Sequence, residues 1–155
     1  MPVEIEHKYL INFEKWEGIK PDSSIPISQA YMKTDGEKTI RIRTTDTIAY
    51  LTIKGKTVGA TRSEFEYEIP LEEGQQLMTQ FCENKVEKVR HLVAIGSHTW
   101  EVDQFIGENE GLWVAEIELE SESEEYDLPE WITQNVTLEG KYTNAALAKN
   151  PYSKW

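Results

Sequence analysis

Residues 3–10 read Val-Glu-Ile-Glu-His-Lys-Tyr-Leu, a stretch in which charged and uncharged side chains alternate. Successive side chains of a β-strand point to opposite faces of a sheet, so Glu4, Glu6 and Lys8 would share one face. The opposite face would carry Val3, Ile5, His7 and Tyr9. The stretch therefore predicts a strand with one charged face and one mainly apolar face.

The same alternation recurs along most of the chain and predicts about eight strands. We expect them at residues 3–10, 27–33, 39–43, 49–54, 63–69, 85–95, 99–105 and 112–120. Short turn signals such as Thr34-Asp35-Gly36-Glu37 favour hairpins and antiparallel neighbours. Apolar residues at helical spacing predict helices at 13–19, 71–82 and 143–149. These elements predict an α+β fold, in which eight antiparallel strands suffice to close a β-barrel around one small ligand.

Length and composition indicate one globular domain that spans residues 1–155. No apolar run approaches the roughly 20 residues of a membrane-spanning helix. A net charge of −12 disfavours nucleic acid and anionic membranes as partners, unless the basic residues gather in one place. The single cysteine, Cys82, excludes an internal disulfide, and no signal peptide is legible, so we expect a cytoplasmic protein.

The charged faces of the predicted strands are sorted by sign. Basic runs pair Arg41 with Arg43 and Lys88 with Arg90, and acidic runs join Glu64, Glu66 and Glu68, then Glu101 and Asp103, then Glu116, Glu118 and Glu120. Like charges two residues apart on a strand lie about 7 Å from each other and repel. For any one run, exposure to water is the simpler explanation, because solvent screens the repulsion. Their repetition favours a closed sheet whose charged faces meet across a lumen.

Such a lumen would need counter-charges, because an unpaired buried charge costs several kcal/mol. Cross-lumen ion pairs could supply some of them, and a polyanion with a divalent metal could supply the rest. Arginine forks and lysine ammonium groups suit a chain of phosphoryl groups. Clustered carboxylates without cysteine or histidine suit Mg²⁺ or Mn²⁺ before Zn²⁺, and Ca²⁺ also fits this ligand set.

An ordered series of motifs resembles one known family. The series is Glu4-Ile5-Glu6-His7-Lys8, Gln29-x-Tyr31, Arg41-x-Arg43, Lys54, Arg62-x-Glu64-x-Glu66, Lys88-x-Arg90, Glu101-x-Asp103 and Glu116-x-Glu118. It resembles the CYTH family, also called triphosphate tunnel metalloenzymes, from residue 3 to about residue 147. The resemblance implies one domain built as an eight-stranded antiparallel tunnel with charged side chains inside, which binds a triphosphate and a divalent metal.

The resemblance also implies an activity. The ending Leu138-Glu139-Gly140-Lys141-Tyr142-Thr143-Asn144 is similar to that of short bacterial tripolyphosphatases, which implies metal-dependent hydrolysis of inorganic triphosphate to pyrophosphate and phosphate. Nucleoside or thiamine triphosphatase, class IV adenylyl cyclase and polyphosphate synthesis are alternatives within the family. A barrel that holds polyphosphate or nucleotides without turnover is a rival from another class. An acid-coated sheet that binds calcium or a protein partner is a third.

Individual roles follow from the resemblance, residue by residue. The implied metal ligands are Glu4, Glu6, Asp103, Glu116 and Glu118, and Glu64 and Glu66 would support the basic residues or bind a second metal. The implied phosphate-binding residues are Lys8, Arg41, Arg43, Lys54, Arg62, Lys88, Arg90 and Lys141. Lys8 with Tyr31 would assist hydrolysis, and Lys88 or Lys8 would help remove a proton from water. The expected cofactor is Mg²⁺ or Mn²⁺, and the expected partner is a small polyanionic triphosphate. Neither nucleic acid nor a membrane is expected as a partner, and a homodimer is possible.

Several other residues are expected to have structural roles. His7, His91 and His98 lack the spacing of metal ligands and are expected to pack or to lie on the surface. Cys82 would belong to the apolar stripe of its helix and to the core. The acidic stretch 120–127 is expected to be a solvated loop.

Overall fold

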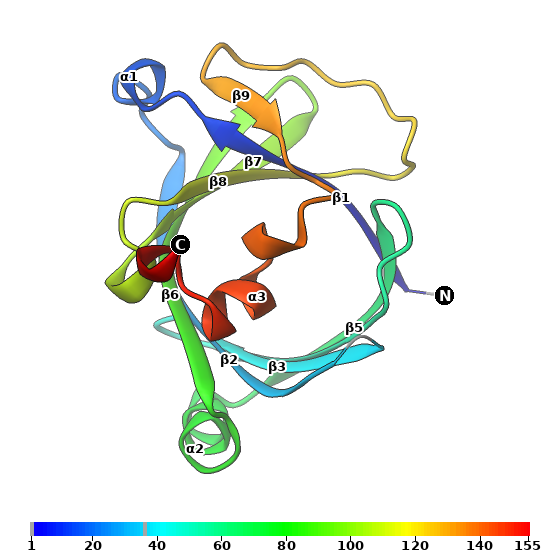
Figure 1. Ribbon diagram of the computed structural model, residues 1–155, viewed down its shortest axis with the longest axis vertical. Coiled ribbons are helices and arrows are strands. Elements are labelled where there is room, and N and C mark those ends of the chain that lie inside the picture. The colour runs from blue at the N-terminus through cyan, green and yellow to red at the C-terminus, as the bar shows by residue number, and fades with distance from the viewer. Residues whose placement is uncertain (1, 36) are drawn as a thin grey trace.

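Eight antiparallel strands close into a barrel in the computed structural model, which describes residues 2–35 and 37–155 (Figure 1). The strands are β1 (Val3–Ile11), β2 (Ser23–Thr34), β3 (Lys38–Thr44), β4 (Ala49–Gly55), β5 (Thr61–Ile69), β6 (Asn84–Ile95), β7 (His98–Phe105) and β8 (Trp113–Glu118). Around the barrel they follow the order β5-β4-β3-β2-β6-β7-β8-β1, and pairing of β1 with β5 completes the ring. The predicted α+β class and closed eight-stranded barrel are confirmed.

A ninth strand, β9 (Ile132–Asn135), pairs with β1 at Tyr9 and Ile11, beyond the point where β1 leaves β5. Sequence reasoning missed this strand because its four residues, Ile-Thr-Gln-Asn, carry too short an alternation. The predicted turn at 34–37 includes Gly36, which lies outside the described residues.

The helices are shorter than predicted. They are α1 (Phe13–Trp16), α2 (Leu71–Phe81) and α3 (Asn144–Lys149), with 3₁₀ turns η1 (Gly107–Asn109), η2 (Gly140–Tyr142) and η3 (Tyr152–Lys154). Asn12 caps α1 as expected, because its side chain accepts a hydrogen bond from the Lys15 amide. The placement of Cys82 was wrong, since α2 ends at Phe81 and Cys82 is half-buried in extended backbone that leads into β6. None of the helices in the described part of the chain has the length and apolar character needed to span a lipid bilayer.

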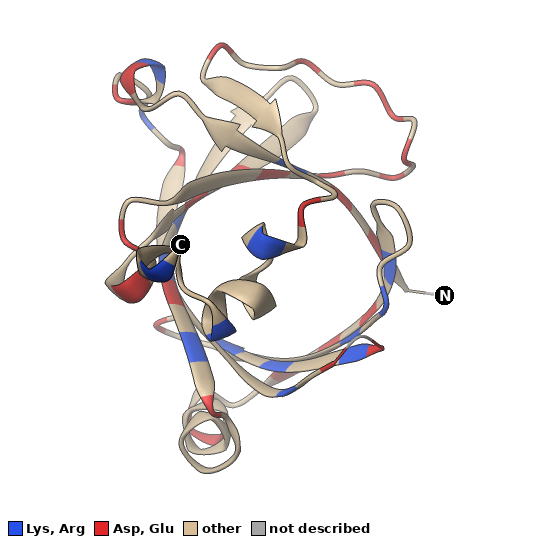
Figure 2. Ribbon diagram, in the orientation of Figure 1, with Lys and Arg blue, Asp and Glu red and all other residues tan. Residues whose placement is uncertain are grey.

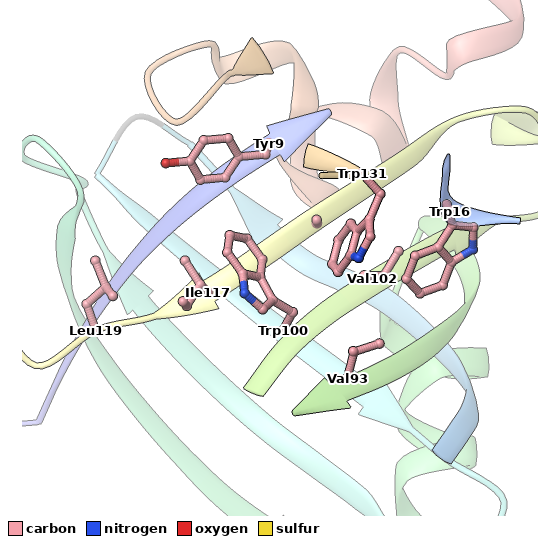
Figure 3. Packing of buried hydrophobic residues seen from close by; sticks show 9 residues of the cluster. Tyr9, Trp16, Val93, Trp100, Val102, Ile117, Leu119 and Trp131 are labelled. Carbon is pink, nitrogen blue, oxygen red and sulfur yellow. The ribbon is translucent and has the colours of Figure 1, made fainter. Parts of the chain in front are cut away.

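An aromatic core lies outside the barrel wall, against the outward faces of β1, β7 and β8 (Figure 3). Trp100 and Ile117 come from the strands, whereas Trp16 comes from α1 and Trp131 from the segment before β9. The ring centroids of Trp16 and Trp131 are 5.0 Å apart in an edge-to-face arrangement. Because the apolar faces of these strands are buried on the outside, their charged faces must point inward.

A smaller apolar cluster lies on the inner side of the barrel, where α3 and η2 cross the ring of strands (Figure 1). Leu147 of α3 and Tyr142 of η2 pack there against Val86 of β6 and Val114 of β8. The carboxy-terminal segment therefore forms one wall of the interior space, and the rest of that space is lined by charged side chains.

Candidate active site

The barrel encloses a cavity of about 430 Å³ whose lining is mostly charged. Eight basic and eight acidic residues line it: Lys8, Arg41, Arg43, Lys54, Arg62, Lys88, Arg90 and Lys149, with Glu4, Glu6, Asp35, Glu64, Glu66, Glu101, Glu116 and Glu118. Figure 2 shows the basic segments concentrated on the strands of the barrel wall. Arg41 and Lys54 are each 6% exposed and Glu116 is 5% exposed, so the reading in which these faces point to water is wrong.

A first group of charges joins β3, β4 and β5 around Glu66. One carboxylate oxygen of Glu66 lies 2.9 Å from Arg43, and the other lies 3.6 Å from Arg41 and accepts a 3.0 Å hydrogen bond from Thr52. Both arginines line the cavity, yet their buried Nε atoms have no hydrogen-bond partner among the described residues. Burial, and then the charge of Arg41, lower the pKa of Arg43. Unsatisfied buried cationic donors favour the binding of an anion here.

A second group lies where β1 meets β5. The ammonium of Lys54 lies 3.0 Å from Glu4 and 3.2 Å from Glu64, and Arg62 Nε lies 3.3 Å from Glu4. Burial alone would raise the pKa of Glu4, but Lys54 and Arg62 outweigh it and lower that pKa to about 2. Burial and the adjacent Glu4 carboxylate raise the pKa of Glu64 to about 7. The two carboxyls therefore compete for one ammonium group.

A third group joins β1, β6, β7 and β8 around Glu116. Its two carboxylate oxygens lie 3.5 Å from Lys8 and 3.6 Å from Arg90, and Arg90 also contacts Glu101 at 2.7 Å. Burial would raise the pKa of Glu116, but the surrounding cations, Lys8 first, lower it well below its usual range. Burial would likewise lower the pKa of Lys8, but Glu116 and then Glu6 raise it. Lys8 is therefore held as an ammonium ion.

Lys88 is the most deeply enclosed cation of the site. Its ammonium donates to Asp103 at 2.7 Å and to Asn144 of α3 at 3.2 Å, and neither Lys88 nor Asp103 has an exposed side-chain surface. Burial and the neighbouring Arg90 lower the pKa of Lys88 to about 8. Lys88 thus loses its proton more easily than Lys8, whose pKa is raised.

Glu6 and Glu118 differ from the other acids, because neither forms an ion pair within residues 2–35 and 37–155. They are directly opposite one another on β1 and β8. Burial, and then the carboxylates of Glu116 and Glu4, raise the pKa of Glu6 to about 8. Burial and Glu4 also raise the pKa of Glu118. Crowding of carboxyl groups without basic partners therefore disfavours ionisation on this side of the cavity, and a bound cation would stabilise the ionised forms.

The structure gathers nearly all of the sequence-predicted site residues in one cavity, with three qualifications. Lys141 is exposed, and its ammonium lies 4.4 Å from the ring centroid of Trp155, away from the cavity lining. Asp103 lies behind the lining, with its carboxylate bound by Lys88 and Arg90. Tyr31 lines the cavity but shares no hydrogen bond with Lys8 in the described part of the chain, and its hydroxyl accepts from Gln29 at 3.3 Å.

Other lining residues were missed as site candidates. Those with charged or amide side chains are Gln29, Asp35, Glu101, Asn144 and Lys149. Glu101 and Gln29 stood in quoted motifs and could have been found by strand parity, since each shares its face with a predicted site residue. Asn144 and Lys149 reach the cavity only because α3 folds across the barrel, and no local pattern signals that placement.

The arrangement of acids does not form a closed metal cage. Within the described residues, no group of three or more Asp, Glu, His or Cys side chains converges as a ready metal site. Most of the carboxylates are separated by the cations that they pair with. Mg²⁺ is commonly held by one or two carboxylates together with water and substrate phosphates, so the donor set suits such a loosely held ion.

A closed antiparallel barrel lined inside by paired acids and bases defines a class of tunnel proteins suited to polyanions. The chain belongs to the CYTH domain family, whose model matches residues 2–148. The resemblance read from the ordered motifs is therefore confirmed.

Two curated relatives match nearly the whole chain. An inorganic triphosphatase from Acetivibrio thermocellus is 39% identical over 156 residues, covering 100% of this chain and 99% of the relative. An inorganic triphosphatase from Nitrosomonas europaea is 29% identical over 152 residues, covering 94% of this chain and 96% of the relative.

Solved structures share the fold. The crystal structure of an inorganic triphosphatase superimposes with a TM-score of 0.63 at 28% identity, covering 96% of this chain and 95% of that one. A protein from Pyrococcus horikoshii OT3 has a TM-score of 0.60 at 22% identity, covering 77% of this chain and 79% of that one. The second likeness concerns the fold alone.

Proposed function

We propose that the cavity binds inorganic triphosphate and hydrolyses it to pyrophosphate and phosphate. The observation that carries this proposal is the pair of enclosed arginines in the cavity lining, Arg41 and Arg43, which share the single carboxylate of Glu66 and whose buried Nε atoms have no hydrogen-bond partner among the described residues. The proposal is supported by the full-length similarity to chains named inorganic triphosphatases.

The cations would hold the phosphoryl chain along the cavity. Arg41 and Arg43 offer planar donor sets from β3, and Lys54 and Arg62 face them from the β4–β5 side. Lys8, Lys88 and Arg90 would complete the set from β1 and β6. Each cation already has a carboxylate neighbour, so substrate oxygens would share these donors with the acids. Lys149 of α3 is a further candidate, because it lines the cavity although it is exposed, whereas Lys141 lies outside the lining.

A divalent cation, Mg²⁺ or Mn²⁺, fits the cavity acids that form no ion pair within the part of the chain that the structure describes. Glu6 and Glu118, with Glu4 and Glu116 beside them, would hold it, and their oxygen donors suit a hard ion. When bound, the metal would neutralise charge on the phosphoryl oxygens and polarise the phosphorus centre. Glu64 and Glu66 are engaged by cations and suit a supporting role. A metal-binding role for Asp103 stays a prediction.

In the hydrolysis itself, a water molecule attacks a terminal phosphorus, and the bond from that phosphorus to the bridging oxygen breaks. Phosphoryl transfer requires chiefly alignment and charge neutralisation from the protein. Lys8, held as an ammonium ion by Glu116, is suited to stabilising charge on the phosphoryl group. Of the two lysines, Lys88 has the lower pKa, and in its neutral form it would accept the proton that the attacking water loses. Tyr31 would orient a phosphate oxygen beside Arg41.

The strongly acidic surface is compatible with a polyanionic substrate. The cavity lining contains equal numbers of acids and bases, although the chain as a whole carries a charge of −12. Distant surface charges are screened within about 8–10 Å at physiological ionic strength, whereas groups in an enclosed cavity interact strongly. A metal-complexed substrate also carries less charge and is repelled less.

One observation weighs against the retention module. A barrel that only retains polyphosphate would have no need for acids beside the anion. Here Glu6 and Glu118 line the same cavity as the cations and form no ion pair within the described residues. Thiamine triphosphate and nucleoside triphosphates would need room in the cavity for an organic group. A comparison of turnover between these compounds and inorganic triphosphate tests whether that room exists. The homodimer and the cytoplasmic location stay predictions.

The test is a panel of inorganic triphosphate, ATP, thiamine triphosphate and long-chain polyphosphate, each with Mg²⁺, with Mn²⁺ and with excess chelator. We expect metal-dependent release of phosphate with the highest kcat/KM for inorganic triphosphate. Glu116→Ala should abolish turnover, while Glu14→Ala removes an exposed acid of α1 and should leave it intact. Undiminished turnover in chelator would contradict the metal role, and binding of triphosphate without turnover would favour the retention module.

A further inference from the structure

The ladder that closes the barrel is its shortest one. Three residue pairs join β1 to β5, namely Val3 with Ser63, Glu4 with Arg62 and Ile5 with Thr61, whereas six pairs join β4 to β5. We call residues 3–5 and 61–63 the closing seam. It matters to the cavity because it sets Glu4 opposite Arg62. Beyond Ile5 the two strands separate, since β1 continues alongside β9.

Glu122 reaches the end of this seam from the segment that follows β8. One carboxylate oxygen accepts a 3.0 Å hydrogen bond from the Ala60 amide, and the other accepts a 3.0 Å hydrogen bond from the Thr61 hydroxyl. The adjacent Gly59 has φ +64°, and a Cβ on it would lie 2.7 Å from the Glu122 carboxylate. The backbone before β5 is thus shaped around this carboxylate. The carbonyl of Ala60 in turn accepts from the Glu6 amide of β1 at 3.2 Å.

The segment that carries Glu122 is a largely exposed loop, as expected for residues 120–127, and it is also anchored to the barrel. The Tyr126 hydroxyl lies 2.6 Å from His7 Nδ1 and 2.5 Å from the Tyr9 hydroxyl, both on β1. The Glu124 carboxylate is hydrogen-bonded to the amide of Glu120 and to His98 of β7. Glu122 therefore projects from a fixed support on the outer wall.

We propose that Glu122 is a positioning residue for the cavity, which holds Ala60 and Thr61 at the closing seam so that Arg62 meets Glu4. Arg62 directly follows Thr61, and its Nε lies 3.3 Å from Glu4, the acid that also pairs with Lys54. Loss of the Glu122 contacts would let the short ladder fray from its open end, because terminal pairs of a ladder have the lowest local stability. Arg62 would then lose its alignment while the interior core stays packed. The expected effect on catalysis rests on the proposed triphosphatase function.

The test compares Glu122→Ala with Glu125→Ala. Glu125 is an exposed acid of the same loop that makes no hydrogen bond or ion pair within the described residues, so both variants remove one negative charge. We expect Glu122→Ala to raise KM for inorganic triphosphate about fivefold and to keep kcat within about twofold, with Glu125→Ala unchanged. Glu122→Gln should restore KM, because an amide can accept from Ala60 and donate to the Thr61 hydroxyl. Equal KM values in the two alanine variants would overturn the inference.

Two further measurements separate this inference from the proposed function. In a double-mutant cycle, Glu122→Ala should have no further effect on KM in an Arg62→Ala background, whereas additive effects would show that Glu122 does not act through Arg62. Amide hydrogen exchange at residues 58–63 should accelerate in Glu122→Ala and stay unchanged in Glu125→Ala. Equal exchange in both variants would overturn the inference whether or not the chain hydrolyses triphosphate. Absence of turnover in the unaltered chain would instead refute the proposed function.

Discussion

Replacement of Asp103 by asparagine should destabilise the barrel from within. Asp103 is fully buried and accepts hydrogen bonds from Lys88 at 2.7 Å and from Arg90 at 2.8 and 3.0 Å. Burial alone would raise its pKa, but Arg90 and Lys88 outweigh burial and lower it, so the carboxylate is charged in the folded protein. The Asn side chain keeps the shape and removes the charge that both cations share.

The size of the stability loss depends on which partners Lys88 and Arg90 keep in the Asp103→Asn variant. Removal of one partner from a buried ion pair costs about 3–5 kcal/mol. Arg90 keeps Glu101 at 2.7 Å, while Lys88 keeps only the neutral Asn144 as a hydrogen-bond partner among the described residues. We therefore expect the lower end, about 3 kcal/mol. For a domain of this size, that loss lowers Tm by roughly 6–12 °C.

The assay is thermal unfolding followed by circular dichroism in chelator, with Asp127→Asn as the matched control. Asp127 is exposed and forms no ion pair within the described residues, so its variant should change stability by less than about 0.5 kcal/mol. Equal Tm values for the two variants would refute the reasoning. A metal-ligand role for Asp103 makes a different prediction, because Asp103→Asn would then raise the Mg²⁺ concentration needed for half-maximal turnover.

Three further predictions concern substrate binding, pH and packing. Arg43→Ala should raise KM for inorganic triphosphate about tenfold or more, because a charge-assisted hydrogen bond to the substrate is lost. Lys20→Ala, which removes an exposed cation outside the cavity lining, should leave KM unchanged. Equal KM values for the two variants would show that Arg43 does not bind the substrate. In chelator, the free energy of unfolding should fall as pH rises from about 5 to 8, since burial and nearby carboxylates keep Glu6 protonated in the folded state while the unfolded state releases its proton. Urea unfolding of Glu6→Gln should show a shallower fall, and a parallel profile would contradict this assignment. Gly74→Ala should lower the free energy of unfolding by about 1–3 kcal/mol, because a Cβ there would clash with the Ala49 side chain of β4. Gly18→Ala is the control, since a Cβ at Gly18 meets no atom within 4 Å. Equal melting curves for the two variants would show that α2 shifts to make room.

The barrel could be predicted because strand alternation is a local property. Most of the charged strand residues point inward, and the common face of Glu4, Glu6 and Lys8 is visible from their spacing without any partner strand. The sorting of charges by sign then indicated which faces would meet. The bounds of the strands differ from the prediction by at most four residues, at the start of β2.

The pairing of the charges could not be predicted, because it depends on register across the closed barrel. Lys54 and Glu4 are 50 residues apart and meet only when β1 closes onto β5. The same limit applies to the carboxy-terminal segment. Lys141 belongs to the motif that predicted a phosphate-binding residue, yet its ammonium lies over the ring of Trp155. Lys149 of α3 was not predicted, yet it lines the cavity. Both outcomes follow from how α3 packs through Leu147 onto the inner face of the barrel.

A crystal structure of the chain soaked with inorganic triphosphate in chelator would test the charged interior most directly. The account predicts electron density for a phosphoryl chain inside the barrel, within hydrogen-bond distance of Arg41 and Arg43. Triphosphate bound only on the outer surface, at a concentration that saturates the protein in solution, would contradict it.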